Sequence, residues 1–442
     1  MLRVEGFRVH SSRLRQRLAR AGATVDEARE VVTLPAELVA EALAAAPGEF
    51  DLHDLDGKPV RVREGSIAET IGTYVEAVQW LDYGDETLRP SSLSDLQKGL
   101  KLADALPLVK KAGILVTPLD LPVEEQERQA LRAIFTTTRK SPSFGIQNVD
   151  QAGLILEALA AAAPELDLQR QPAGTFACSP TSPLVLDADS GDVLVHAAGK
   201  GLVPILAPCP MAGATSQFSI IGTVWQQVVE NLFMVTAKFA VDAEGPLLWG
   251  GAGAAMDMKV GDVSYGGIER SLMMLANIDM ACHLGLPCHS PAASVDSCLI
   301  DAQLGAEKIW TYMTRWLSKA AMGIGVGAVT NGKAVSLEQM VIDADLLGCM
   351  RRLAEGIELD HLAAAIGEIT ATGHGENFMM GEATLELLGK GEEYFYPATF
   401  NRGGTHAAPM LQRAHDQVED LLANWRNPVP EKIREEIDWL LG

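Results

Sequence analysis

The amino-acid sequence predicts a (β/α)8 barrel with an N-terminal helical lead-in and a C-terminal helical tail. Eight short apolar stretches recur between residues 69 and 326, and helical patterns separate them. Residues 203–257 predict a buried strand, a loop rich in Pro, Gly and Ser, a long helix and a second buried strand, which is a βαβ crossover. A doubly wound open sheet is the main alternative. It would normally show a GxGxxG turn after its first strand, and none occurs there.

Three regions follow in order along the chain. Residues 1–66 are expected to form a lead-in that packs on the barrel, with helices at 11–21 and 35–46 and a hairpin at 50–62 around an Asp-Gly turn. Residues 67–335 should form the barrel, and residues 336–442 the C-terminal helices and a capping tail. The last helix is expected to start at Pro430, because proline favours the first turn of a helix.

The expected barrel elements are short and regularly spaced. The strands are predicted at residues 69–74, 114–117, 144–147, 175–179, 203–207, 246–250, 287–290 and 323–326. The helices between them are predicted at residues 92–105, 123–136, 151–162, 217–240, 267–283 and 301–320. Because parallel strands are apolar throughout, the polar groups that do chemistry are expected where the strands end.

Composition excludes several classes of partner. The formal net charge is −22, which argues against binding of nucleic acid. No apolar run indicates a membrane span, and the first residues do not resemble a signal peptide, so a cytoplasmic protein is expected. The six cysteines are scattered without a CxxC pair, which predicts reduced thiols. No metal-ligand spacing is present, so no metal is expected.

Four segments carry a resemblance to a known family. They are Pro-Met-Ala-Gly-Ala-Thr-Ser at 210–216, Met-Asp-Met at 256–258, and the stretches 294–308 and 396–402. With these the chain resembles the trimethylamine methyltransferase family, including its pyrrolysine-free members that demethylate quaternary amines such as glycine betaine. The likeness runs from about residue 45 to the end of the sequence.

The resemblance implies a reaction. In the family a (β/α)8 barrel transfers a methyl group from an amine nitrogen to the cobalt of a corrinoid, which is carried by a separate small protein. No tightly bound cofactor is expected in this chain itself. The sequence contains only the twenty ordinary residues, and the absence of pyrrolysine shifts the expected substrate towards a quaternary amine. When a quaternary amine loses a methyl group, the amine departs as a neutral molecule and needs no proton from the protein. Catalysis should therefore come from positioning of the substrate.

Aromatic and acidic residues near the strand ends are candidates for holding the cation. Trp249 ends the sixth predicted strand and could form a wall of a cation–π cage or pack within the barrel. Tyr74 and Tyr265 are further cage candidates. Asp257 and Asp296 follow the sixth and seventh strands and are the candidate catalytic carboxylates, although Asp296 could equally cap a helix.

Other polar residues are expected to contact the rest of the substrate or the corrinoid. His289 lies beside Cys288, but neighbouring strand residues point to opposite sides, which favours a carboxylate-binding role over a zinc site. The remaining substrate-binding candidates are Asn331, His374 and Arg402; the last two could instead form a turn and a structural pair. The candidates for contact with the corrinoid are Gln147, Asn148, Met211 and Gly250.

Two other functions stay open at this point. One is a metal-dependent barrel lyase or hydrolase, and the other is a subunit that binds amines without turnover. The helical lead-in and tail are also compatible with a homo-oligomer.

Overall fold

An eight-stranded parallel sheet forms the centre of the computed structural model, which describes residues 1–73, 76–291, 295–390, 394–401 and 408–442. Its strands are, in chain order, β6 (Gly72–Thr73), β9 (Lys111–Gly113), β10 (Ser141–Gly145), β11 (Gly174–Cys178), β13 (Leu202–Leu206), β15 (Leu248–Trp249), β18 (His289–Pro291) and β19 (Met322–Val326). The order in the sheet is β15-β13-β11-β10-β9-β6-β19-β18, and a parallel bridge between Trp249 and Cys288 joins its two ends. The predicted (β/α)8 barrel is therefore confirmed.

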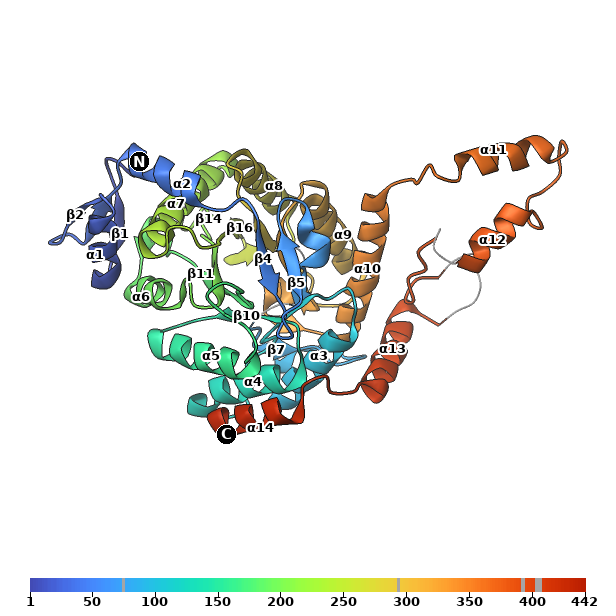
Figure 1. Ribbon diagram of the computed structural model, residues 1–442, viewed down its shortest axis with the longest axis horizontal. Coiled ribbons are helices and arrows are strands. Elements are labelled where there is room, and N and C mark those ends of the chain that lie inside the picture. The colour runs from blue at the N-terminus through green and yellow to red at the C-terminus, as the bar shows by residue number, and fades with distance from the viewer. Residues whose placement is uncertain (74–75, 292–294, 391–393, 402–407) are drawn as a thin grey trace.

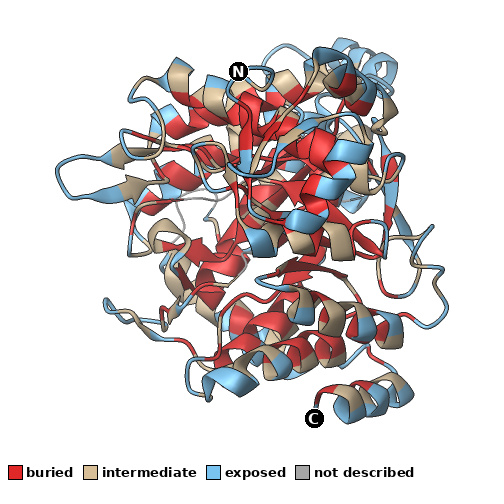
Figure 2. Ribbon diagram, turned by 90° about the vertical axis from the view of Figure 1, so that its left-hand side faces the viewer, coloured by how far each residue is buried: buried red, intermediate tan, exposed pale blue. Residues whose placement is uncertain are grey.

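Helices surround this sheet (Figure 1). They are α3 (Leu93–Ala105), α4 (Val123–Thr137), α5 (Val149–Ala162), α6 (Ala188–Ala197), α7 (Ile220–Val241), α8 (Ile268–His283), α9 (Ala302–Leu317) and α10 (Leu337–Glu355). Their starts follow the sequence: Ser92 and Asp95, for example, form a capping box that satisfies two backbone N–H groups at the start of α3. Buried residues concentrate where helices meet the sheet (Figure 2).

The second strand begins earlier than its pattern predicts. β9 runs from Lys111 to Gly113, whereas the apolar run predicts a strand at 114–117. In a sequence, a lysine is normally predicted to lie on the surface. Lys111 is instead buried, and its ammonium donates to Thr175 Oγ1 at 2.8 Å. This hydrogen bond and a second one to Met322 Sδ, both inside the barrel, let the lysine occupy a strand position.

The lead-in contains more strand than expected. The predicted helices are present as α1 (Ser12–Arg20) and α2 (Ala36–Ala45), and the hairpin as β4 (Phe50–His53) with β5 (Pro59–Val62), followed by the short η1 (Ser66–Glu69). Three strands were not anticipated: β1 (Phe7–Val9), β2 (Thr24–Asp26) and β3 (Val31–Thr33). Three residues are too few to show an alternating pattern. β1 also pairs with β12 (Val185–Leu186), which lies in the barrel segment.

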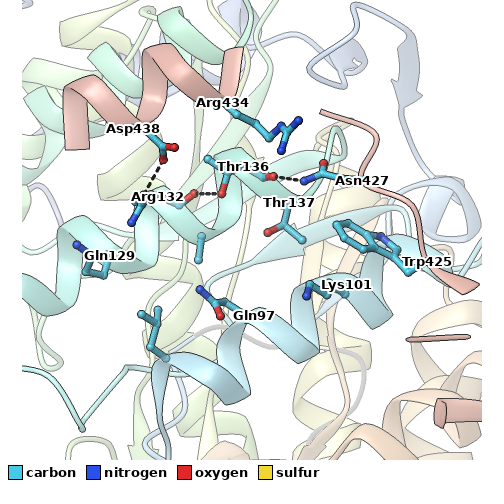
Figure 3. A pocket seen from close by; sticks show the side chains of 12 residues that line it. Gln97, Lys101, Gln129, Arg132, Thr136, Thr137, Trp425, Asn427, Arg434 and Asp438 are labelled. Atoms are coloured by element: carbon cyan, nitrogen blue, oxygen red, sulfur yellow. Dashed lines mark hydrogen bonds and ion pairs between the residues drawn. The ribbon is translucent and has the colours of Figure 1, made fainter. Parts of the chain in front are cut away.

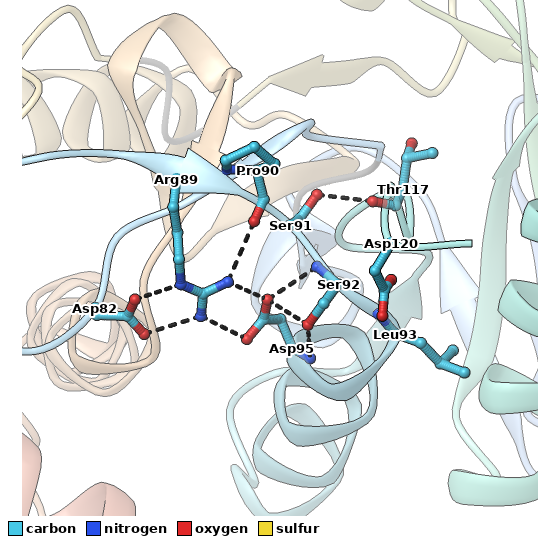
Figure 4. A network of polar contacts seen from close by, with 9 residues as sticks. All are labelled: Asp82, Arg89, Pro90, Ser91, Ser92, Leu93, Asp95, Thr117 and Asp120. Atoms are coloured by element: carbon cyan, nitrogen blue, oxygen red, sulfur yellow. Dashed lines mark hydrogen bonds and ion pairs between the residues drawn. The ribbon is translucent and has the colours of Figure 1, made fainter. Parts of the chain in front are cut away.

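Two small sheets lie beyond the carboxyl ends of the barrel strands. One contains β14 (Met211–Ala212), β16 (Ala254–Asp257) and β17 (Asp262–Ser264). The other contains β7 (Gln79–Trp80), β8 (Arg89–Pro90), β20 (Ala328–Val329) and β21 (Ala334–Val335), with η2 (Thr330–Gly332) between the last two. The guanidinium of Arg89 bridges Asp82 and Asp95, and so ties the β7–β8 loop to the start of α3 (Figure 4).

The C-terminal helices divide into two pairs. α11 (Leu362–Ala371) and α12 (Glu382–Lys390) project away from the barrel, whereas α13 (Met410–Asn424) and α14 (Glu431–Leu441) return to it (Figure 1). At α14, Arg132 pairs with Asp438 at 2.6 Å, and Asn427 donates to the Thr136 carbonyl at 2.9 Å (Figure 3). The polar pocket beside these contacts lies between helices, outside the ring of strands. Of the helices described, none has the length and apolar character needed to span a bilayer.

A buried ion pair joins α9 to α10. Lys308 Nζ lies 2.8 Å from Asp343 Oδ2, and both side chains are fully buried. Asp343 also accepts from the Gly327 N–H and from Gln339. We expect Lys308→Met to lower the free energy of unfolding by about 3 kcal/mol, because it leaves a buried carboxylate without its cation.

Urea unfolding of the full chain would measure this loss. The double variant Lys308→Met/Asp343→Leu should recover part of it, because both charges are then removed. An unchanged urea midpoint in the single variant would contradict the assignment.

Candidate functional site

A cavity of about 300 Å³ lies at the carboxyl ends of the barrel strands. Its wall is formed by residues at or just after β6, β10, β11, β13, β15, β18 and β19. Apolar residues such as Ile205 and Ile324 make up much of it. Few polar groups converge there, which is the usual composition of a small-molecule site.

Glu76 supplies the negative charge of the cavity. It follows β6 and is the one carboxylate among the described residues that line the wall. Its carboxylate accepts the Gly145 N–H at 3.1 Å, and burial raises its pKa above the usual 4.5. Its backbone φ is 62°, a left-handed conformation that is strained for a residue with a Cβ. A Cβ on residue 145 would lie 2.5 Å from Glu76 Oε2, so a side chain there would displace the carboxylate from this position.

Arg270 brings the opposite charge from another part of the wall. It lies in the first turn of α8, lines the cavity and is 2% exposed. Its guanidinium lies 4.6 Å from the ring centroid of Tyr265, a cation–π arrangement. Tyr265 also lines the cavity, and burial raises its pKa. Glu76 follows the first barrel strand and Arg270 the sixth, so the two charges belong to different sides of the ring.

Asp296 fixes the loop that carries Tyr265. Its carboxylate accepts the N–H groups of Tyr265 and Gly266 at 2.6 and 2.8 Å, and the Ser264 hydroxyl at 2.6 Å. These three hydrogen bonds hold the loop in place, so Asp296 affects the cavity by fixing the position of Tyr265. It is not among the residues that line the cavity, so the structure supports a positioning role for it.

His289 and Asn331 present buried polar atoms to the cavity. Neither ring nitrogen of His289 has a hydrogen-bond partner among the described residues, and the side chain is 3% exposed. Burial lowers the pKa of His289 to about 3, and the nearby Lys111 adds to the shift, so the imidazole is neutral. Asn331 donates to the Val263 carbonyl at 2.8 Å, while its Oδ1 has no partner within the described part of the chain. Buried polar atoms without partners indicate a ligand position.

The depressed pKa of His289 predicts a pH dependence of stability. The unfolded chain takes up a proton near pH 6.5, but folded His289 does not until about pH 3, so stability is lost as pH falls between these values. We expect the non-titrating His289→Gln variant to lose about 1 kcal/mol less than the parent between pH 7 and pH 5.5. Urea unfolding at both pH values measures this difference, with exposed His283→Gln as control. Equal losses in all three proteins would contradict it.

Trp249 lies outside the cavity. It is fully buried, and its indole N–H donates to Asn277 of α8 at 2.8 Å, on the helix side of the strand. Its neighbour Gly250 is also absent from the lining; its carbonyl accepts from Asn231 and Asn277, and a Cβ there would lie 2.6 Å from the Leu206 carbonyl oxygen. Both residues pack the sixth strand against its helices.

Four other candidates occupy turns and caps near the rim. Asp257 is exposed and accepts the Lys259 N–H at 2.8 Å. Asn148 caps α5 through Gln151, and Gln147 donates its own N–H to the Gln151 side chain. Met211 closes a turn in which its carbonyl accepts from residues 214–216. None of the four is among the cavity-lining residues of the described chain.

The remaining candidates lie away from the cavity or outside the described residues. His374 is exposed in the segment between α11 and α12, which projects from the barrel (Figure 1). Tyr74 and Arg402 lie outside the described residues. The structure therefore brings Tyr265, His289 and Asn331 together in one cavity.

Glu76 and Arg270 were missed in the sequence. Glu76 follows its predicted strand by two residues, so a search for charges just beyond each strand end could have found it. Arg270 sits in a helical first turn, where an arginine looks like an ordinary surface residue. No group of three or more His, Cys, Asp or Glu side chains suited to a metal occurs among the residues that the structure describes.

Comparison with known proteins gives a consistent result. A family profile described as "Trimethylamine methyltransferase (MTTB)" matches residues 1–439. The trimethylamine methyltransferase MttB of Methanosarcina barkeri strain Fusaro is 28% identical over 431 residues, which cover 95% of this chain and 86% of that protein. The glycine betaine methyltransferase of Desulfitobacterium hafniense strain Y51 is 26% identical, with coverage of 92% and 85%.

A solved structure shares the fold. The crystal structure of the monomethylamine methyltransferase MtmB of Methanosarcina barkeri aligns with a TM-score of 0.52 and 14% identity. The alignment covers 94% of this chain and 89% of that one.

Proposed function

Since the chain belongs to the trimethylamine methyltransferase family, and is a methyltransferase, we propose that it demethylates a small betaine. A betaine carries a quaternary ammonium and a carboxylate in one molecule. The methyl acceptor is Co(I) of a reduced corrinoid on a partner protein. The observation that carries this proposal is the pair of opposite charges, Glu76 and Arg270, in one largely apolar cavity.

The two charges fit the two ends of such a zwitterion. A quaternary ammonium cannot donate a hydrogen bond, so it is held by charge and by aromatic faces. Glu76 offers the charge, and the hydrogen bond from the Gly145 N–H holds its carboxylate at the cavity wall. The substrate carboxylate would lie at Arg270. A methylated amine without a carboxylate would make no ion pair with the guanidinium of Arg270.

His289 and Asn331 can complete the binding of the substrate. Neutral His289 carries one N–H, which can donate to a carboxylate oxygen. The buried Oδ1 of Asn331 accepts, and so suits a water or a polar group of the substrate. Tyr265, held by Asp296 and stacked on Arg270, keeps the guanidinium in place.

This methyl transfer depends on positioning of the substrate more than on acid or base catalysis. The bond between the methyl carbon and nitrogen breaks, its electron pair stays on nitrogen, and a neutral tertiary amine leaves. The corrinoid supplies the nucleophile, whose electron pair forms the new bond to the methyl carbon. No proton moves, which fits an imidazole that is neutral at all physiological pH values. The protein removes water and aligns the N–methyl bond with the cavity mouth.

The rim offers a surface for a protein-borne acceptor. Phe218 and Met258 are 66% and 65% exposed, and both lie against Gly213 in the loop after β13. Trp225 in the second turn of α7 is 59% exposed. Exposed apolar side chains gathered near a site are typical of a binding surface. The residues present therefore fit docking of a corrinoid protein near the mouth.

A spectrophotometric assay tests the proposal. Purified protein, cob(I)alamin or a corrinoid protein, and glycine betaine, proline betaine, carnitine or choline are mixed, and loss of the Co(I) absorption band is followed. Demethylated amine is quantified in parallel. We expect transfer with at least one carboxylate-bearing substrate and little with choline. Tight binding of a betaine with no transfer to either acceptor would favour an amine-binding subunit and overturn the proposal.

A further inference from the structure

The projecting arm, defined here as residues 356–390, buries almost none of its apolar surface within the single chain. It comprises α11, α12 and the segments that flank them, and it extends from the end of α10 into solvent (Figure 1). Neither helix has a buried residue. Ten large apolar side chains in the arm are 40–88% exposed: Ile357, Leu359, Leu362, Ile366, Ile369, Phe378, Met379, Met380, Leu385 and Leu388.

The composition of α11 is that of a covered helix. Its sequence, Leu-Ala-Ala-Ala-Ile-Gly-Glu-Ile-Thr-Ala, contains one charged residue, Glu368. A helix that is apolar on nearly every side is normally buried. Helices of this length, ten and nine residues in α11 and α12, are also marginal in water without tertiary packing. Something outside the single chain must therefore cover the arm.

An apolar groove lies at the base of the arm. It has a volume of about 590 Å³ and is lined by residues of α10, of the first two positions of the arm and of segment 394–401, including Leu353, Ile357, Tyr394 and Phe400. Arg352 is the charged residue among its described lining. The arm itself is acidic, with six carboxylates and one lysine between residues 356 and 390. The groove thus matches the arm in apolar character, although an arm cannot fold back onto its own base without reversing its course.

We propose that two copies of this chain exchange arms, so that α11 of each lies in the groove of the other. The contact is two-fold symmetric and self-complementary, as expected for a homodimer. At roughly 100 Å² for each exposed apolar side chain, two arms would bury about 2,000 Å², which is the range of permanent dimers.

The position of the arm argues against the methyl acceptor as its cover. α10 begins just after Asn331 at the cavity rim and runs for 19 residues, so the arm leaves the barrel about 28 Å along the helix from the rim. An acceptor must also bind and leave in every turnover, whereas α11 needs a permanent cover. The inference does not depend on which amine is the substrate.

The mass of the full chain in solution tests the proposal first. Light scattering coupled to gel filtration should give a dimer or a multiple of it for the parent protein. The double variant Ile366→Asp/Ile369→Asp should halve that mass, whereas Lys432→Asp at an exposed position of α14, outside the arm, should leave it unchanged. A monomeric parent at tens of micromolar, or a double variant that keeps the parent mass while remaining folded by circular dichroism, would overturn the proposal.

Cross-linking decides the case in which the double variant fails to fold. Ile366→Cys, in a Cys298→Ser background, places a thiol on α11 that a short bismaleimide can join to Cys349 in the groove of the second copy. We expect a covalent dimer that disappears when Cys349→Ser is added. A fast-migrating monomer with an internal cross-link would show instead that the arm folds onto its own groove, and would overturn the exchange.

Discussion

Glu76→Gln should lower kcat/KM for a quaternary amine about a thousandfold. The substitution keeps the size of the side chain and a group that can accept the Gly145 N–H, but it removes the one carboxylate among the described cavity-lining residues. A cation that has lost its water then has no counter-charge, and truncating such a buried pair costs about 4 kcal/mol, which is about a thousandfold. The loss should appear mainly in KM, because the charge of the substrate is present before the methyl group moves.

Steady-state methyl transfer with glycine betaine measures the effect of Glu76→Gln. Glu124→Gln, an exposed carboxylate on α4, is the matched control and should behave as the parent. A Glu76→Gln protein with parental KM and kcat would remove Glu76 from the site. A loss confined to kcat would assign it a role in the reaction step in place of binding.

The pH profile adds a second readout for the same residue. Because burial raises the pKa of Glu76, the group takes up a proton at a higher pH than an ordinary carboxyl, and the binding charge is lost there. The kcat/KM of the parent should therefore fall on acidification while exposed carboxyls are still ionised. The residual kcat/KM of Glu76→Gln should not show this fall at acid pH.

Arg270→Gln should separate substrates by their carboxylate. We expect kcat/KM for a betaine to fall about a thousandfold, because the buried carboxylate loses its guanidinium partner. For choline, which carries a hydroxyl in that place, kcat/KM should change much less, because no substrate carboxylate loses its ion-pair partner. The specificity ratio between the two substrates is the quantity to measure.

Two further variants make the Arg270 result interpretable. Arg270→Lys keeps the charge but not the planar fork, so it should recover part of the betaine activity. Arg170→Gln, whose side chain is 87% exposed in the parent, should change nothing. Equal losses for betaine and choline in Arg270→Gln would mean that Arg270 only supports Tyr265 and does not select the substrate.

The barrel could be predicted from the sequence because buried parallel strands are apolar along their whole length, and eight such runs alternate with helical patterns. The same uniform apolar character makes the first and last residue of each strand harder to predict. Nothing within a uniformly apolar run marks its boundary, and a charged residue such as Lys111 falls outside an apolar pattern although it begins β9.

The cavity was predicted in part. Tyr265, His289 and Asn331 lie at or after strand ends, where a barrel collects its polar groups, and the structure places them in the cavity. Trp249 shows the limit of that argument. When both faces of a strand are apolar, the pattern does not tell which side chains point inward, and its indole turns to Asn277. Arg270 was beyond reach because its position depends on how α8 meets the barrel.

The strained, desolvated state of Glu76 has a consequence for the evolution of such chains. A positive φ and a buried carboxylate that accepts one hydrogen bond among the described residues both work against folding, so this residue gives up stability for binding. A descendant that no longer binds a cation gains stability from a neutral residue that tolerates a positive φ at position 76, such as glycine or asparagine. Gly145, whose freedom from a side chain serves Glu76, then comes under weaker selection. Loss of this acid and glycine together would mark the relatives that have abandoned quaternary amines.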